Sequence, residues 1–167
     1  MSDLPPTTGW RVGWGFDSHR LDGDPPLILG GQVVSESIGV SATSDGDVLA
    51  HAITDAVLGA CSLGDLGTHF PSDDPALVDA DSMMLLRQVA TMAIAAGWRI
   101  AHVDATVVAE HVRVAPYRER IISSLAETLA IDVGDVSVKA TSTDGIGFTG
   151  RGEGLAATAV VTVEALS

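Results

Sequence analysis

Two short runs of this sequence contain one carboxylate and two imidazoles, which are the types of ligand found in catalytic metal sites. The run Gly13 to Arg20 contains Asp17 and His19, and the run Ser44 to His51 ends on a second histidine. If the first run is a strand, Asp17 and His19 lie on one face, because strand side chains alternate with period two. If the second run enters a helix, His51 closes the group. An Asp/His/His set leaves a fourth position open, as is typical of a catalytic rather than a structural zinc ion.

These residues also have plainer interpretations, and spacing alone leaves the alternatives about equal. In the structural interpretation, Asp17 caps a turn and both histidines lie on the surface. Asp55, one helical turn after His51, either orients the His51 imidazole or is a solvated helix residue. Gly13 and Gly15 share the face of Asp17 and keep it open for a ligand or another backbone. They are not a dinucleotide fingerprint, because the third glycine and the following helix are missing.

Two further groups are rich in hydroxyls, glycines and acids. Lys139 to Asp144, followed by the glycine-rich segment Gly145 to Gly154, can cradle phosphate oxygens or form an ordinary turn between strands. Arg151 there either binds a diphosphate bidentately or pairs with Glu153. The segment Gly64 to Asp74 binds polyol hydroxyls or is an ordinary acidic loop.

Hydrophobic periodicity and turn residues predict the elements that position these groups. We expect strands at Arg11–His19, Trp98–Glu110, Val136–Ser142 and Leu155–Leu166, a hairpin at Leu27–Val34, and helices from Ser44 or Asp45 to about Ser62, from about Ser82 to Ala96 and from Pro116 to Ala130. Asp47 is expected as a capping-box acid. The first helix is expected to be amphipathic, with Leu49, Ile53 and Val57 opposite Asp47, His51 and Asp55.

This order predicts one α/β (α+β) domain at residues 10–167, with a four-stranded mixed sheet, after a disordered tail at residues 1–9. The last strand is small or apolar on both faces, so both faces of the sheet need cover. Three helices can cover one face. The other face is then a candidate subunit contact, unless helices cover both.

Composition limits the classes of function. With 46% hydrophobic and 19% charged residues, the 167-residue chain is not disordered, and no apolar run reaches the ~20 residues that a bilayer requires. The N-terminus is not a secretory signal, and the single Cys61 is typical of a reducing cytoplasm. A net charge of −13 argues against nucleic-acid binding. An anionic substrate would therefore need metal cations and backbone N–H groups around it.

Four ordered motifs carry a resemblance that covers about residues 10–166. They are Gly15–His19, Ser44–Val48 with His51, Leu63–Gly67 with Phe70-Pro71, and Gly147–Gly154. They resemble the 2-C-methyl-D-erythritol 2,4-cyclodiphosphate synthases of the non-mevalonate isoprenoid pathway. The resemblance implies a homotrimer with active sites between subunits. Each site would cyclise 4-diphosphocytidyl-2-C-methyl-D-erythritol 2-phosphate and release CMP.

The resemblance also implies the site residues. Asp17, His19 and His51 would bind zinc or a similar cation, and a second cation, magnesium or manganese, would bridge the substrate diphosphate. Thr43 and Ser142 stand at the catalytic positions. The implied substrate-binding residues are Asp17, His19, Thr43, Ser44, Asp65, Leu66, Gly67, Phe70, Pro71, Ser72, Asp73, Asp74, Ala109, Arg113, Val114, Ala115, Ala140, Thr141, Ser142, Thr143, Asp144, Phe148 and Arg151.

Within this set, residues 65–74 would meet the erythritol moiety, and residues 109–115 and 140–144 of a neighbouring subunit would meet the cytidine side. A cavity on the threefold axis, near Phe16, Phe148, Arg151 and Glu153, would bind an isoprenoid diphosphate in some members.

The chain departs from the family pattern at several positions. Thr43 replaces a usual histidine, Thr68 a frequent lysine, Val112 a common proline and Ser142 a usual threonine. The loss of the histidine favours a rival hypothesis, a non-catalytic relative that binds metal, nucleotide or isoprenoid diphosphate. A third hypothesis is a metal-dependent phosphohydrolase, whose product would be linear.

Overall fold

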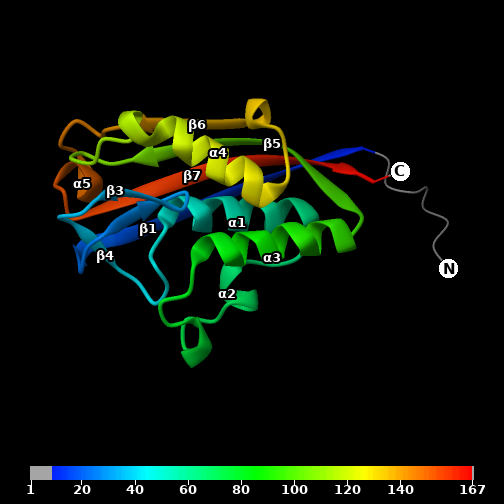
Figure 1. The fold of residues 1–167 in the computed structure, drawn as a ribbon, viewed down its shortest axis with the longest axis horizontal. Helices are drawn as coiled ribbons and strands as arrows, with labels where there is room; N and C mark the ends of the chain where they lie inside the picture. Colours follow the sequence, from blue (N-terminus) through cyan, green and yellow to red (C-terminus); the bar gives the residue numbers. More distant parts are fainter. Residues whose placement is uncertain (1–8, 167) are drawn as a thin grey trace.

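The computed structural model describes residues 9–166, and the predicted tail lies outside them except for Gly9. Figure 1 shows the elements. In chain order they are β1 (Trp10–Gly23), β2 (Leu27–Leu29), β3 (Gln32–Ser35), β4 (Gly39–Ser41), α1 (Val48–Cys61), α2 (Leu66–His69), η1 (Pro75–Leu77), α3 (Ser82–Ala95), β5 (Trp98–Val108), η2 (Ala115–Tyr117), α4 (Arg118–Leu129), η3 (Val133–Asp135), β6 (Val136–Thr141), α5 (Gly147–Gly150) and β7 (Gly154–Ala165). Within residues 9–166, no helix is long and apolar enough to cross a membrane.

The main sheet is mixed and has five strands in the order β4-β1-β7-β5-β6. Among the strand pairs of the described residues, only β5–β6 is parallel. The predicted four-stranded sheet is therefore wrong by one edge strand. The missed strand, β4, has three residues, which is too short for an alternating pattern to show. The β2–β3 hairpin turns at Gly30-Gly31 as predicted, with both glycines at positive φ.

Helix α1 lies directly on β1, and two glycines make this close approach possible. A Cβ atom at Gly13 would stand 1.9 Å from the Ala56 carbonyl oxygen, and one at Gly15 would stand 2.0 Å from that of Ala52. The open face predicted for β1 is thus occupied by another backbone. Helix α1 is held over the strand that carries Asp17 and His19.

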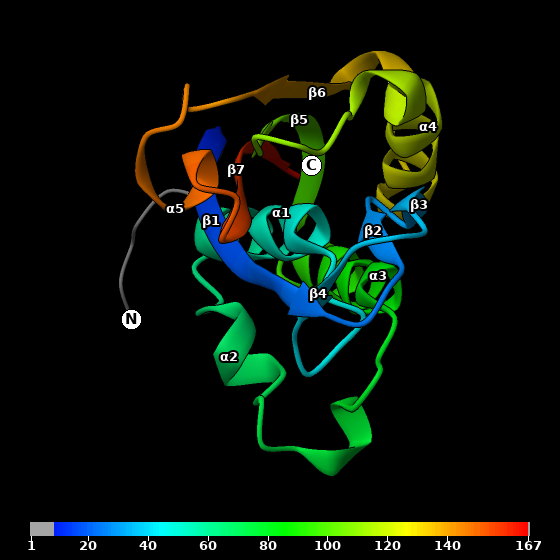
Figure 2. The same cartoon turned by 90° about the vertical axis from the view of Figure 1, so that its left-hand side faces the viewer.

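The predicted amphipathic pattern of α1 is wrong, because the helix is buried on nearly every side. Only Asp55 is half-buried and only Gly59 is exposed. The helix contacts the sheet on one side and α3 and β2 on others, and Figure 2 shows it between the strands and α3. Its N-cap is Asp47 rather than Ser44 or Asp45. The Asp47 carboxylate accepts hydrogen bonds from the N–H groups of Ala50 and Gly31, which ties the helix start to the hairpin.

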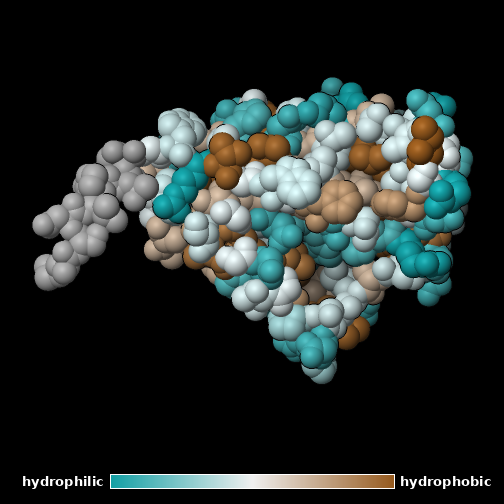
Figure 3. All heavy atoms as spheres, turned by 180° about the vertical axis from the view of Figure 1, so that it is seen from behind, coloured by the Kyte–Doolittle hydropathy of each residue, from teal (hydrophilic) through white to brown (hydrophobic). Residues whose placement is uncertain are grey.

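Within residues 9–166, the helices α1, α3 and α4 leave the opposite face of the single α+β domain uncovered. On this face Trp10, Val12 and Trp14 are 64–66% exposed, and Phe16 and Val160 are also exposed. The rings of Trp14 and Phe16 stack with centroids 6.2 Å apart. Figure 3, which views the molecule from behind, shows hydrophobic side chains over the upper half of this face. Such a large apolar patch is typical of an interaction surface.

Candidate metal centre

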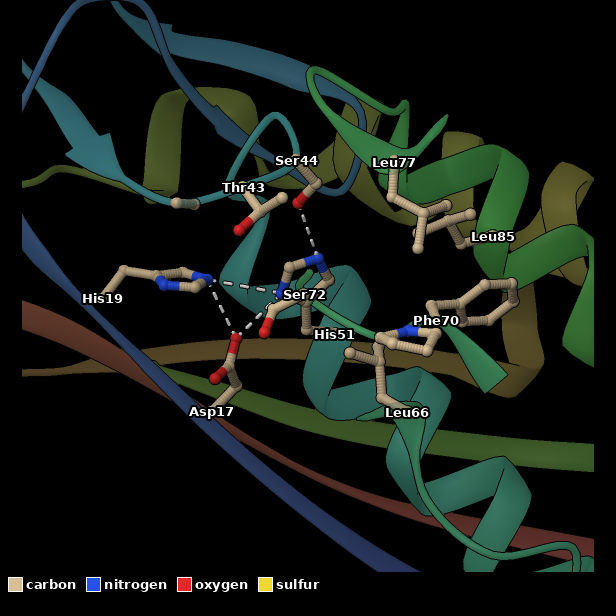
Figure 4. Close-up of a pocket in the computed structure, with 12 residues that line it drawn as sticks. Asp17, His19, Thr43, Ser44, His51, Leu66, Phe70, Ser72, Leu77 and Leu85 are labelled. Atoms are coloured by element: carbon tan, nitrogen blue, oxygen red, sulfur yellow. Dashed lines mark hydrogen bonds and ion pairs between the residues drawn. The ribbon is translucent and has the colours of Figure 1, made fainter. Parts of the chain in front are cut away.

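Asp17, His19 and His51 converge at one point between β1 and α1, as Figure 4 shows. Asp17 Oδ2 lies 3.0 Å from His19 Nε2 and 2.9 Å from His51 Nδ1, and the two nitrogens are 3.3 Å apart. The three ligand atoms all lie within 4.8 Å of one another. The predicted convergence is confirmed. It follows from strand alternation at Asp17 and His19, and from the position of His51 in the first turn of α1.

The far nitrogen of His51 is held by a group that the sequence did not single out. His51 Nε2 lies 2.9 Å from the Ser82 hydroxyl oxygen and 3.2 Å from that of Ser44. The Ser82 hydroxyl in turn donates to Asp45. Asp55 instead accepts a 2.7 Å hydrogen bond from the Leu66 N–H, so it fixes the start of α2 rather than the imidazole.

The electrostatics of the three residues favour a cation. Burial alone would raise the pKa of Asp17, but the hydrogen bonds and charges of His19 and His51 outweigh it and hold the pKa well below the usual carboxyl range. Burial alone would lower the pKa of His51, but the Asp17 carboxylate outweighs it and raises the pKa above 6.5. A carboxylate oxygen and two imidazole nitrogens that converge in this way fit a divalent cation such as zinc.

A cavity of about 180 Å³ opens beside the three residues. Of the residues implied for substrate binding, it is lined by Asp17, His19, Thr43, Ser44, Leu66, Phe70, Pro71 and Ser72. Ala42, Leu77 and Leu85 complete the wall and were not predicted. Leu77 and Leu85 come from η1 and α3, whose approach to the site is a tertiary property that local sequence does not show.

Two other residues implied for the erythritol side instead cap short helices. The Asp65 carboxylate accepts from both the N–H (2.8 Å) and the hydroxyl (2.7 Å) of Thr68 at the start of α2. The Asp74 carboxylate accepts from the Ala76 N–H at 2.9 Å. Gly67 lies within α2, and Asp73 is exposed in the following loop. In the described part of the chain these four residues do not line the cavity.

The residues implied for the cytidine side form a separate pocket of about 370 Å³. It is lined by Ala109, Val112, Arg113, Val114, Ala115, Pro116, Arg118, Ala140, Thr141 and Ser142. Among residues 9–166 this pocket has no lining residue in common with the cavity at the metal centre. Thr143 and Asp144 follow it, where the Thr143 hydroxyl donates to the Ile146 carbonyl and the Ser142 hydroxyl donates to Asp144. The structure thus divides the implied substrate residues into two groups within one chain.

Phe148 lines a third pocket, which shares His19 with the metal centre and is also lined by Ser18, Arg20, Glu153 and Gly154. Arg151 pairs with Glu153 at 2.8 Å, so the intramolecular alternative for this arginine is the one present in the chain.

Comparison with known proteins places this chain in one family. The model of the YgbB family matches residues 10–164. The 2-C-methyl-D-erythritol 2,4-cyclodiphosphate synthase of Shewanella halifaxensis is 50% identical over 90% of this chain and 95% of its own. The synthase of Syntrophomonas wolfei is 49% identical over 92% and 98%.

Solved structures show a similarity that extends over nearly the whole of this chain. A structure of the bifunctional IspDF from Campylobacter jejuni matches with a TM-score of 0.94 and 38% identity, over 99% of this chain and 45% of that longer one. A CDP complex of IspF from Plasmodium falciparum matches with a TM-score of 0.83 and 29% identity, over 97% and 100%.

Proposed function

This chain belongs to the YgbB family, and we infer that it forms 2-C-methyl-D-erythritol 2,4-cyclodiphosphate, the product for which relatives about 50% identical to it are named. The substrate is 4-diphosphocytidyl-2-C-methyl-D-erythritol 2-phosphate, and the second product is CMP. The observation that carries this inference is the Asp17/His19/His51 centre, which opens on a cavity that the family motifs line.

The reaction is an intramolecular phosphoryl transfer. An oxygen of the 2-phosphate forms a bond to the β-phosphorus while the bond from that phosphorus to the bridging oxygen breaks, and CMP leaves with that oxygen. The protein mainly positions the two ends in line and neutralises charge. A zinc or similar ion held by Asp17, His19 and His51, with magnesium or manganese on the diphosphate, would supply the Lewis-acid charge stabilisation. The activity is therefore that of a divalent-metal-dependent phosphorus–oxygen lyase.

The chain's own side chains hold the substrate. The hydroxyls of Thr43 and Ser44 lie on the cavity wall beside the three ligands and can donate hydrogen bonds to phosphate oxygens. Phe70 and Leu66 form an apolar wall that limits water around the reacting phosphates. Ser142 lines the second pocket, and its hydroxyl, which donates to Asp144 within the chain, would donate to the diphosphate instead when substrate binds.

A homotrimer explains how the two separated pockets act together. If the pocket at Ala109–Arg118 and Ala140–Ser142 of a neighbouring subunit faces the cavity beside Asp17, His19 and His51 of this one, the substrate lies across the contact between the two subunits. The exposed apolar face of β1 is the candidate contact surface. Phe148 would then lie near the threefold axis, where an isoprenoid diphosphate can bind. A cytoplasmic location stays a prediction from the single cysteine.

The test is a direct assay of the purified protein with the diphosphocytidyl substrate and Mg²⁺. We expect stoichiometric CMP and a cyclic diphosphate, identified by ³¹P NMR, and loss of both when a chelator removes the metal. No CMP would support the non-catalytic alternative, which the relatives do not favour. A linear product would support the phosphohydrolase.

A further inference from the structure

The environment of His51 Nε2 determines which nitrogen of this imidazole carries a proton. Ser82 is fully buried at the start of α3, and both of its donors point to one carboxylate. Its hydroxyl donates to Asp45 Oδ1, and its backbone N–H donates to Asp45 Oδ2 at 3.2 Å. Asp45 Oδ1 also accepts from the Asp47 N–H at 3.2 Å, and the Asp45 N–H donates to the Ala80 carbonyl at 3.0 Å. The carboxylate is therefore fixed from several directions.

A serine hydroxyl has a single hydrogen, and in Ser82 it is used by Asp45. The Ser82 oxygen can therefore only accept at its 2.9 Å contact with His51 Nε2. The reverse direction would leave the fully buried Ser82 oxygen facing an Asp45 oxygen without a hydrogen between them. An unsatisfied contact of this kind is costly when buried. Nε2 consequently carries the proton.

With its proton kept on Nε2, His51 binds a cation through Nδ1, whose lone pair becomes available when the cation replaces the hydrogen that Nδ1 donates to Asp17. Nδ1 is the atom that faces Asp17 Oδ2 at 2.9 Å and His19 Nε2 at 3.3 Å. Metal-binding histidines typically donate their other N–H to a carboxylate or another oxygen, which fixes ring and tautomer. Here the carboxylate acts through an intervening hydroxyl.

We propose that Asp45 and Ser82 are positioning residues that hold His51 in its Nε2–H tautomer and so direct its Nδ1 lone pair at a divalent cation. The inference rests on the proposed function, because it takes Asp17, His19 and His51 as the cation ligands. It assigns roles to two residues outside that ligand set, one of them 31 residues from His51 in sequence.

Zinc affinity is the first test, measured by competition with a chromophoric chelator. We expect Ser82→Ala and Asp45→Asn to bind zinc about 10- to 100-fold more weakly than the parent protein. Thr54→Val is the matched control. Thr54 is a fully buried hydroxyl on α1, one turn from His51, but it donates to the Ala50 carbonyl, so its loss should leave zinc affinity unchanged. Equal losses in all three variants, or none in Ser82→Ala, would overturn the proposal.

The second test identifies the protonated nitrogen of His51 directly, in zinc-loaded protein labelled with ¹⁵N-histidine, where the metal occupies the place between the ligand atoms. Parent protein should show His51 with Nε2–H, and Ser82→Ala should show a mixed population. A parent His51 with Nδ1–H contradicts the proposal. Parent protein that binds none of zinc, magnesium and manganese contradicts the proposed metal-dependent function instead, so the two failures are distinguishable.

Discussion

At Thr43 the chain places an uncharged hydroxyl where the resemblance to the synthases implies an imidazole, on the wall of the cavity beside Asp17, His19 and His51. A histidine can carry positive charge and reach further towards developing negative charge on the phosphates. We expect Thr43→His to raise the turnover number for CMP release by about tenfold or more, since one well-placed donor in such a site is worth about 10²–10³ in kcat.

Thr43→Gln is the control, because it adds a neutral donor of similar reach. It should gain much less than Thr43→His. A turnover number that stays flat or falls in Thr43→His would mean that Thr43 belongs to a differently arranged site in this chain.

The pKa of His51 also has a measurable consequence. The Asp17 carboxylate raises this pKa above 6.5, and the imidazole must lose its proton before Nδ1 can bind a cation. Zinc affinity should therefore still be rising as pH increases through 6.5, by up to about tenfold per pH unit, and level off only beyond the raised pKa. Apparent zinc dissociation constants measured from about pH 5.5 to about pH 8.5 check this. Affinity that is already constant at pH 6.5 would contradict it.

The three ligand residues could be predicted from sequence because each obeys a local rule. Asp17 and His19 are two residues apart on a strand, and His51 lies one turn into a helix. Ser82 had no such signal, since its contact with His51 depends on how α3 crosses α1. Asp45 belonged to a recognised motif, but the sequence favoured a capping role that Asp47 takes instead.

At the scale of elements, the contact between β1 and α1 is the one on which the metal centre depends. Gly15→Ala would drive a Cβ atom into the Ala52 carbonyl and force the helix away from the strand. We expect unfolding free energy to fall by about 3 kcal/mol or more, with loss of zinc binding, because His51 moves away from Asp17. Urea unfolding and zinc titration measure the two effects.

Gly59→Ala serves as the control on the same helix. A Cβ atom there meets nothing within 4 Å, so alanine should be neutral or stabilising by about 0.5–1 kcal/mol. Equal destabilisation by both variants would show that α1 is merely intolerant of substitution.

The long strands and helices were predicted because their hydrophobic periods extend over many residues. Besides the N-cap of α1, the extent of the sheet and the environment of α1 were predicted wrongly, for physical reasons. The strand β4 has only three residues, and its pairing with β1 is a long-range contact. The helix α1 is rich in alanine and buried on nearly all sides, so a stripe of larger apolar residues did not indicate its environment.

At the scale of the whole molecule, the proposed trimer depends on the uncovered sheet face. Trp14→Asp places a charge in the middle of this face, where Trp14 is 64% exposed and stacks on Phe16. Light scattering should then show a monomer in place of a trimer, and CMP release should be lost, because each cavity lacks its neighbour's cytidine pocket. Zinc binding at the three ligands should persist.

Ile94→Asp is the matched control for this variant, since Ile94 is 58% exposed on α3, away from that face. It should leave both mass and activity unchanged. A Trp14→Asp protein that still turns over as a monomer would contradict the shared active site.

The pairing of β1 with β7 joins residues from Trp10–Glu164 to Arg20–Gly154, so an early segment of the chain completes the sheet only with a late one. During translation, Asp17 and His19 leave the ribosome long before β7, the strand that pairs with β1, has been synthesised. Contacts this distant in sequence slow folding. In a nascent chain that stops before Gly154, α1 lacks its contacts with β7. We expect such a chain to be cleaved readily by protease and to bind no cation, even at high cation concentration.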